Sequence, residues 1–183
     1  MRKAAKSREE LIEDLTRVFR QHGYYGTTLS KLTQATGLEK ASLYHYFPKG
    51  KTQMAEQVFA FVLQKLQETV LQVLESKESA EVKLKNFLDA LDIFYNKGTT
   101  VCFLTIFSVG EQSTHMESEL GKALAHWEAL LADVMKDLGL QEPRKQAAYS
   151  LSVIQGGLIL SHLKSDQRIF QNNLEILRKV WGG

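Results

Sequence analysis

Residues 28–51 decide how this chain is interpreted, and they read TLSKLTQATGLEKASLYHYFPKGK. Two short segments within them, 29–36 and 40–47, have apolar residues at helical spacing. Gly37 ends the first segment and Pro48 ends the second, because neither residue favours continuing a helix. Two helices of about two turns that are joined by a glycine-containing turn predict a helix-turn-helix.

In the segment 40–47, apolar side chains that can pack in a core alternate with polar side chains that can contact a binding partner. Leu43 and Phe47 lie one turn apart and are expected to pack on the preceding helix, so that the polar side of the segment faces outward. Its first turn contains small residues, which let a helix N-terminus approach the major groove of DNA, where the four base pairs present different donor–acceptor patterns. The segment therefore predicts a recognition helix.

Working outward, the N-terminal side predicts a first helix that begins after Ser7. Ser7 and Glu10 have the spacing of a capping box, and Gly23 is expected to end the helix. On the C-terminal side, the pattern of residues 51–75 predicts a long helix. It follows the N-terminal region that contains the helix-turn-helix, which we call the head, without a linker. Such a helix would connect the head mechanically to the rest of the chain.

The remaining residues keep a helical pattern to the end of the chain. Further helices are expected over 79–97, 101–109, 116–138, 143–163 and 166–180. The β-branched residues of 101–109 leave a strand as an alternative there. The sequence thus predicts an all-α fold of about nine helices. A helix-turn-helix DNA-binding domain is expected at 1–50 and a ligand-binding and dimerisation domain at 51–183.

The charge is unevenly distributed along the chain. The net charge is +2, but residues 1–52 carry +5 and residues 53–183 carry −3. A basic head suits a polyanion, because cationic groups release the counterions condensed on phosphates. Chance clustering of solvated charge is the alternative explanation.

Cysteine usage and hydropathy indicate a cytoplasmic location without a membrane partner. The single cysteine, Cys102, can form no intrachain disulfide, and its apolar neighbours favour buried packing over an oxidation sensor. The longest apolar run, 58–63, is far shorter than the ~20 residues that span a bilayer. The basic N-terminus is followed by polar residues and not by the apolar stretch of a signal peptide.

Together, residues 28–38 (TLSKLTQATGL) and 42–48 (SLYHYFP) resemble the DNA-binding head of the TetR/AcrR family. The resemblance is strong over about residues 8–55, and the turn at 48–51 resembles a subgroup with an extra residue there. The rest of the chain matches in length and helical character. The resemblance implies a homodimeric regulator, most simply a repressor, that binds palindromic double-stranded operator DNA. A small apolar or amphipathic effector would release it.

The same resemblance implies which side chains contact DNA. Phosphate contacts are implied for Thr27, Thr28, Tyr44, Tyr46 and Lys51, and base-edge contacts for Lys40, Ala41, Ser42 and His45. The two tyrosines could instead serve only as packing aromatics, and His45 could be a solvated surface residue. Glu39 departs from the family, which has Ser or Thr at this N-cap. A glutamate caps poorly and repels phosphates unless it pairs, with Lys40 or with a cytosine amino group.

Aromatic residues in the C-terminal part predict an effector pocket. The expected lining is Phe59, Phe87, Leu91, Phe94, Phe103, Phe107 and Trp127, with Gln155 as a polar contact. The alternative is that these residues form an ordinary core.

The helix expected at 143–163 contains two adjacent glycines, each costing about 1 kcal/mol relative to alanine. Close approach of helices across a homodimer interface would compensate for this cost, and access to the pocket is the competing explanation. The interface residues expected on this basis are Leu151, Ile154, Gly156, Gly157 and Leu158.

Catalytic and metal-binding motifs are not evident in the sequence. The five histidines have no paired ligand spacing, and neither a glycine-rich phosphate loop nor a nucleophile elbow occurs. We therefore expect no enzymatic activity, no metal and no cofactor. A helical small-molecule-binding or adaptor protein without DNA-binding activity is the alternative, supported only by Glu39.

Overall fold

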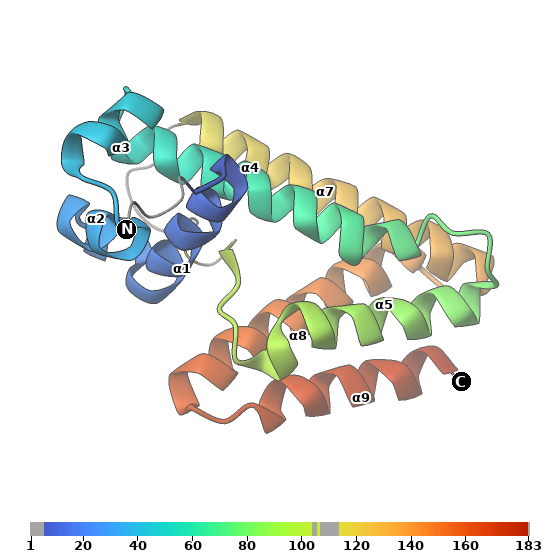
Figure 1. The fold of residues 1–183 in the computed structure, drawn as a ribbon. Helices are drawn as coiled ribbons and strands as arrows, with labels where there is room; N and C mark the ends of the chain where they lie inside the picture. The colour runs from blue at the N-terminus through green and yellow to red at the C-terminus, as the bar shows by residue number, and fades with distance from the viewer. Residues whose placement is uncertain (1–5, 104–105, 107–113, 183) are drawn as a thin grey trace. The chain divides into compact units, whose positions relative to one another are not determined.

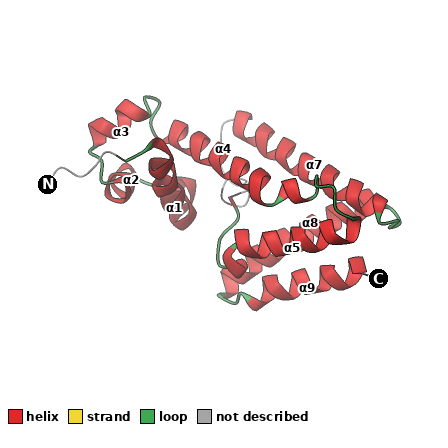
Figure 2. Cartoon of the chain, turned by 45° about the vertical axis from the view of Figure 1, so that its right-hand side comes forward, coloured by secondary structure: helices red, strands yellow, loops and turns green. Residues whose placement is uncertain are grey.

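The structure, a computed structural model, describes residues 6–103, 106 and 114–182. In this part of the chain it consists of eight α-helices and two short 3-10 helices, without a strand (Figures 1 and 2). The predicted all-α class is confirmed, and most of the piece expected at 101–109 lies outside the described residues. The chain divides into two compact units, residues 1–63 and 64–183.

The first unit begins with α1 (Arg8–Gly26), whose N-cap is Ser7 as the sequence predicts. The Ser7 hydroxyl accepts a hydrogen bond from the Glu10 backbone N–H, and the Glu10 carboxylate accepts one from the Ser7 backbone N–H. Gly23 interrupts the helical backbone with a φ of +66°, and helical residues continue beyond it to Gly26. Gly23 therefore introduces a kink where the sequence predicted an end.

Two short helices and the start of a long one complete this unit: α2 (Leu29–Thr36), α3 (Lys40–Tyr46) and α4 (Lys51–Thr69). Thr28 is the N-cap of α2, and its side chain accepts from the Lys31 N–H. Gly37 ends α2 in the left-handed conformation, which glycine adopts at low cost. The core of the unit is formed by Leu11, Leu15, Phe19, Leu32, Leu43, Phe47, Met54 and Val58.

Replacing Ser7 with alanine is expected to lower the free energy of unfolding of the first unit by about 1 kcal/mol. The variant loses the side-chain acceptor for one of the unpaired N–H groups at the helix start. Urea unfolding followed by circular dichroism would measure this change. Equal midpoints for the variant and the wild type would contradict a contribution from the cap.

Glu10, the partner of Ser7 in the capping box, makes the stability of the first unit depend on pH. The pKa of Glu10 lies below its usual value, mainly because its carboxylate accepts the hydrogen bond from the Ser7 backbone N–H. A lowered folded-state pKa stabilises the fold above the unfolded-state pKa, and this contribution disappears as the pH falls through the folded-state value. Glu10→Gln should therefore be less stable than the wild type at pH 7 and equally stable near pH 2. A difference that persists in acid would contradict this assignment.

The second unit contains the end of α4, α5 (Ala80–Phe94), α7 (Thr114–Asp137), α8 (Pro143–Lys164) and α9 (Arg168–Gly182). The long helix expected over 51–75 ends at Thr69 and is followed by the 3-10 helix η1 (Leu71–Val73). The helix expected over 79–97 likewise ends at Phe94, before the 3-10 helix η2 (Asn96–Gly98). In this unit α9 packs on both α5 and α8, and α8 also packs on α7 (Figures 1 and 2).

The core of the second unit draws on all of its long helices. Its buried side chains include Leu84, Phe87, Leu88, Leu91, Trp127, Leu131, Val134, Ile154, Leu158, Phe170, Leu174 and Leu177. Among the described helices, none has both the length and the apolar character needed to cross a membrane.

Candidate nucleic-acid interface

The helix α3 presents one packing face and one exposed face. Leu43 and Phe47 are completely buried, as the sequence predicts. Tyr44 and Tyr46 keep 43% and 36% of their surface exposed. The other predicted contact residues follow the same division: Lys40, Ala41 and His45 are exposed, and Ser42 is half-buried. Burial on one side thus fixes the rotation of α3 and directs its polar side chains into solvent.

Contacts from neighbouring segments hold α3 in place. The Arg8 guanidinium lies 5.8 Å from the centre of the Phe47 ring, within cation–π range. Gly50 has a φ of +67°, and a Cβ atom there would lie 3.3 Å from Cε1 of Tyr44. The Tyr44 ring therefore lies against the backbone of this turn. The Tyr44 ring thus packs while much of its surface stays exposed, and its contact with phosphate stays a prediction.

Glu39 is the N-cap of α3, and its side chain makes no capping hydrogen bond. The carboxylate is exposed. The structure thus agrees with the expectation that glutamate caps this helix poorly. The first turn of α3 keeps N–H groups that its own cap residue does not satisfy.

Lys51 connects the beginning of α4 to the end of α1. Its ammonium donates to the carbonyl oxygens of Tyr24 at 3.1 Å and Thr27 at 3.3 Å, and lies 4.5 Å from the centre of the Tyr24 ring. The residue pattern predicted Lys51 only as a phosphate ligand and predicted no role for Tyr24. An aromatic residue directly after the helix-breaking Gly23 was the available signal.

The two threonines predicted to contact phosphate have different environments. Thr28 is exposed at the N-terminus of α2. Thr27 is only 1% exposed, and its hydroxyl donates to the Gly23 carbonyl at 2.6 Å. The Thr27 hydroxyl is therefore already engaged inside the unit, which disfavours the expected phosphate contact, and that contact stays a prediction.

Comparison with known proteins identifies the family. Residues 6–58, which contain the whole helix-turn-helix, match the model described as bacterial regulatory proteins, tetR family. The chain is a TetR-family transcriptional regulator. It is 26% identical over 162 residues to the HTH-type transcriptional regulator LmrA of Bacillus subtilis strain 168, which covers 85% of this chain and 86% of LmrA. Regulators of this family are not enzymes.

Solved TetR-family structures share the fold of the whole chain. A TetR transcriptional regulator from Legionella pneumophila superposes with a TM-score of 0.81 at 19% identity, covering 97% of this chain and 98% of that one. A cysteine variant of the TetR-family regulator CifR superposes with a TM-score of 0.76 at 19% identity, covering 95% and 98% of the two chains. The CifR structure contains 26-base-pair double-strand operator DNA.

In the second unit of this TetR-family regulator, several residues predicted to line a pocket are buried, and we call the contacting rings of Phe87 and Trp127 the aromatic centre. Phe87, Leu91, Phe103 and Trp127 are buried, and the Phe87 and Trp127 rings contact edge to face at 6.1 Å. Phe94 and Gln155 are half-buried. Phe59 is buried and belongs to the first unit, whereas Phe107 lies outside the described residues.

Five buried side-chain polar atoms of the second unit lack hydrogen-bond partners within the described part of the chain: Ser76 Oγ, Asp92 Oδ1, Trp127 Nε1, Gln155 Nε2 and Trp181 Nε1. Two of them, the indole N–H of Trp127 and the side-chain amide nitrogen of Gln155, belong to residues that were predicted to line the pocket. Leaving a buried donor unsatisfied costs about 1–3 kcal/mol. An acceptor on a bound molecule would recover this energy.

Most of the predicted dimer residues pack inside the second unit. Leu151, Ile154 and Leu158 keep at most 7% of their surface exposed, which disfavours a contact with a partner, and their role in a dimer stays a prediction. A Cβ atom on Gly157 would lie 2.7 Å from Nδ2 of Asn173, which donates to the Val153 carbonyl at 2.9 Å. Gly157 therefore allows α8 and α9 of the same chain to approach each other.

Other residues of α8 and α9 form an exposed apolar face, which we call the α8–α9 face. It comprises the exposed Tyr149, Ile159, Leu160 and Leu163 on α8, with the half-buried Gly156 among them, and Ile176 and Val180 on α9. On α8 these positions repeat at the three- and four-residue spacing of one helix side. Gly156, unlike Gly157, faces open space.

Proposed function

We propose that this TetR-family regulator is a cytoplasmic, ligand-responsive repressor that binds palindromic operator DNA as a homodimer. A small apolar or amphipathic effector releases it from the DNA. The observation that carries the proposal is the orientation of α3. Leu43 and Phe47 are buried in the core of the first unit. Lys40, Ala41 and His45 therefore face the solvent.

The exposed face of α3 has the chemistry of a DNA-reading surface. His45 and Ser42 provide hydrogen-bonding groups for base edges, and the small Ala41 lets the helix enter the major groove. The Tyr44 and Tyr46 hydroxyls can donate to phosphates, as can the exposed Thr28. Lys51 adds a positive charge beside the first turn of α4 while its ammonium keeps the carbonyls of α1 in place.

The α8–α9 face supports the homodimer. Several large apolar side chains remain exposed on it, including Leu163 at 73% exposure. A second copy of the same face covers it most simply, because a twofold axis pairs each patch with itself. Two recognition helices about 34–36 Å apart, or a multiple of this, could then enter successive major grooves of a palindrome.

The buried aromatic centre supports an apolar effector with a hydrogen-bond acceptor. Trp127 offers an unpaired donor beside the ring of Phe87, and Gln155 offers a second unpaired donor in the same unit. α4 continues across the boundary between the units, so a displacement in the second unit reaches the head through a continuous helix. To shift the DNA-competent state from 99% to 1%, the effector must favour the released state by ~5.5 kcal/mol.

Selection from a randomised double-stranded DNA library, followed by mobility-shift assays, tests this function. The wild-type chain should enrich a palindrome. His45→Ala should lose about 1–3 kcal/mol of discrimination at particular base pairs. Tyr44→Phe should weaken binding by about tenfold on all sequences, because it removes only a phosphate contact.

His126→Ala, which replaces an exposed histidine of the second unit, is the matched control and should bind as the wild type does. A uniform loss for His45→Ala would remove this residue from base readout. Failure to enrich any DNA sequence would contradict the repressor and favour a ligand-binding or adaptor protein.

A further inference from the structure

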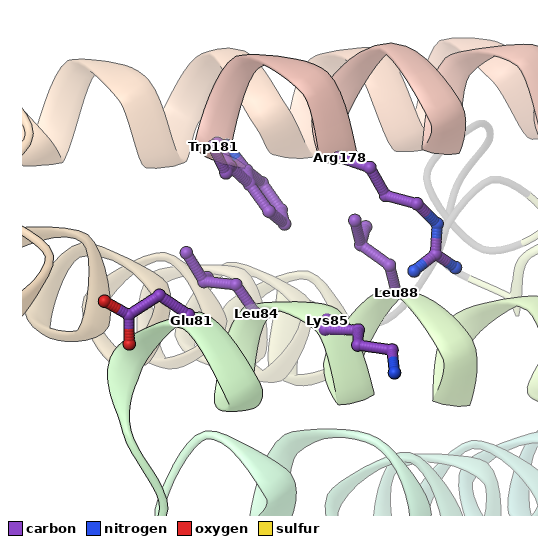
Figure 3. Close-up of a pocket in the computed structure, with 6 residues that line it drawn as sticks. All are labelled: Glu81, Leu84, Lys85, Leu88, Arg178 and Trp181. Atoms are coloured by element: carbon purple, nitrogen blue, oxygen red, sulfur yellow. The ribbon is translucent and has the colours of Figure 1, made fainter. Parts of the chain in front are cut away.

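Acidic side chains at the beginnings of several helices are engaged within the chain, as in the capping box of α1. Figure 3 shows Glu81 at the beginning of α5. Its carboxylate accepts a hydrogen bond from the Ser79 hydroxyl, which holds the pKa of Glu81 below its usual value. Glu142, the N-cap of α8, forms an ion pair with Lys145. These carboxylates therefore already have partners in their own helices.

Glu39 differs from these residues because its carboxylate is free. It is the N-cap of α3, and its side chain makes no capping hydrogen bond. Among the described residues this carboxylate forms no ion pair either, although the neighbouring Lys40 is also exposed. A serine or threonine at this position would stabilise the helix, because its hydroxyl accepts from an N–H group of the first turn. The chain instead has an exposed acceptor at the start of α3.

The start of α3 is the part of a recognition helix that reaches base edges. Burial of Leu43 and Phe47 leaves the opposite side of the helix in solvent, where Glu39 and Lys40 are exposed. These two residues carry opposite charges, so together they add no net attraction to phosphates. A carboxylate that loses its water on DNA is unfavourable unless a hydrogen-bond donor meets it. The donor that suits Glu39 must therefore come from a base.

Cytosine offers this donor most favourably. Its N4 amino group is the hydrogen-bonding group that cytosine presents in the major groove. The N6 amino group of adenine lies between two acceptors, N7 of the same base and O4 of the paired thymine, and both repel a carboxylate. Guanine and thymine present only acceptors there. A carboxylate on α3 thus distinguishes a C·G pair from the other three arrangements.

We propose that Glu39 is a specificity-determining residue whose carboxylate accepts a hydrogen bond from N4 of a cytosine in each half of the operator. This inference rests on the proposed function, because it requires α3 to enter the major groove. Glu39 selects the C·G pair, and it weakens binding to DNA that presents an acceptor at the same place. The weak cap of α3 is the structural cost of this selection.

Two variants of the full chain separate base reading from capping. In selection from a randomised library, the wild type should prefer a C·G pair at one position of each half-site, and Glu39→Ala and Glu39→Ser should lose this preference alone. In mobility-shift assays, replacing that pair with T·A should weaken wild-type binding by about tenfold and variant binding by less than about twofold. Glu39→Ser should also raise the urea midpoint of the first unit, because serine caps α3.

A base analogue and a charge-matched variant identify the contact. Replacing the cytosine with 2-pyrimidinone removes the N4 amino group, and should weaken binding by the wild type more than binding by Glu39→Ala. Comparing the two proteins cancels the effect of the analogue on the DNA duplex itself. Glu13→Ala removes the same charge from an exposed position of α1, outside the helix-turn-helix, and should keep the C·G preference.

Three outcomes would overturn the inference while the proposed function stands, provided that the wild type enriches a palindrome. They are unchanged base preferences in both Glu39 variants, equal weakening of the two proteins by the analogue, and loss of the same preference in Glu13→Ala. Failure of the wild type to enrich any DNA sequence would overturn the proposed function and this inference together. Circular dichroism of each variant confirms that it is folded before binding is measured.

Discussion

The double variant Ile159→Glu/Leu163→Glu is expected to be monomeric and to lose tight operator binding. Both side chains belong to the exposed α8–α9 face, with exposed fractions of 38% and 73%. Four glutamates would meet across a twofold interface, where unpaired buried charges are strongly unfavourable. Because the residues are exposed within a single chain, each unit should still fold.

The effect on DNA binding should be large because two linked heads bind more tightly than one. Joining two binding modules raises the apparent affinity by roughly 10²–10⁴, and a monomer loses this gain. Sedimentation velocity would measure the oligomeric state, and a mobility shift on the selected palindrome would measure affinity.

Ile93→Glu is the matched control for the dimer. Ile93 is 80% exposed but lies on α5, outside the α8–α9 face. This variant should remain a dimer and bind DNA as the wild type does. A double variant that still sediments as a dimer would show that this face is not the interface.

Gly98→Ala is expected to destabilise the second unit by about 3 kcal/mol. Gly98 has a φ of +86°, a conformation that L-residues adopt only at a cost. A Cβ atom there would lie 2.8 Å from Cβ of Phe170, a completely buried residue of α9. The added methyl group would strain the backbone and also displace α9.

Urea unfolding monitored by tryptophan fluorescence would measure this effect, because both tryptophans belong to the second unit. Gly121→Ala is the control: Gly121 lies in α7 with open space around it, and alanine should raise stability by up to about 1 kcal/mol. A Gly98→Ala midpoint equal to or above that of the wild type would contradict the close contact with Phe170.

The head could be predicted from sequence because its signals are local. Ser7 and Glu10 form the predicted capping box, Gly37 ends α2, and α3 buries Leu43 and Phe47 as the spacing requires. Each of these features depends on residues within about one turn of each other. The contact of Lys51 with Tyr24 joins residues 27 positions apart, so the local pattern could not reveal it.

The sequence by itself determined that the chain is helical, that a helix-turn-helix lies near its N-terminus and which side of α3 faces outward. Only the tertiary structure decided which side of α8 is exposed. That helix is apolar around most of its circumference, so periodicity could not separate Leu158, which is buried, from Leu163, which is not. The packing of α9 onto Gly157 makes the difference, and such a contact between distant segments leaves no period in the sequence.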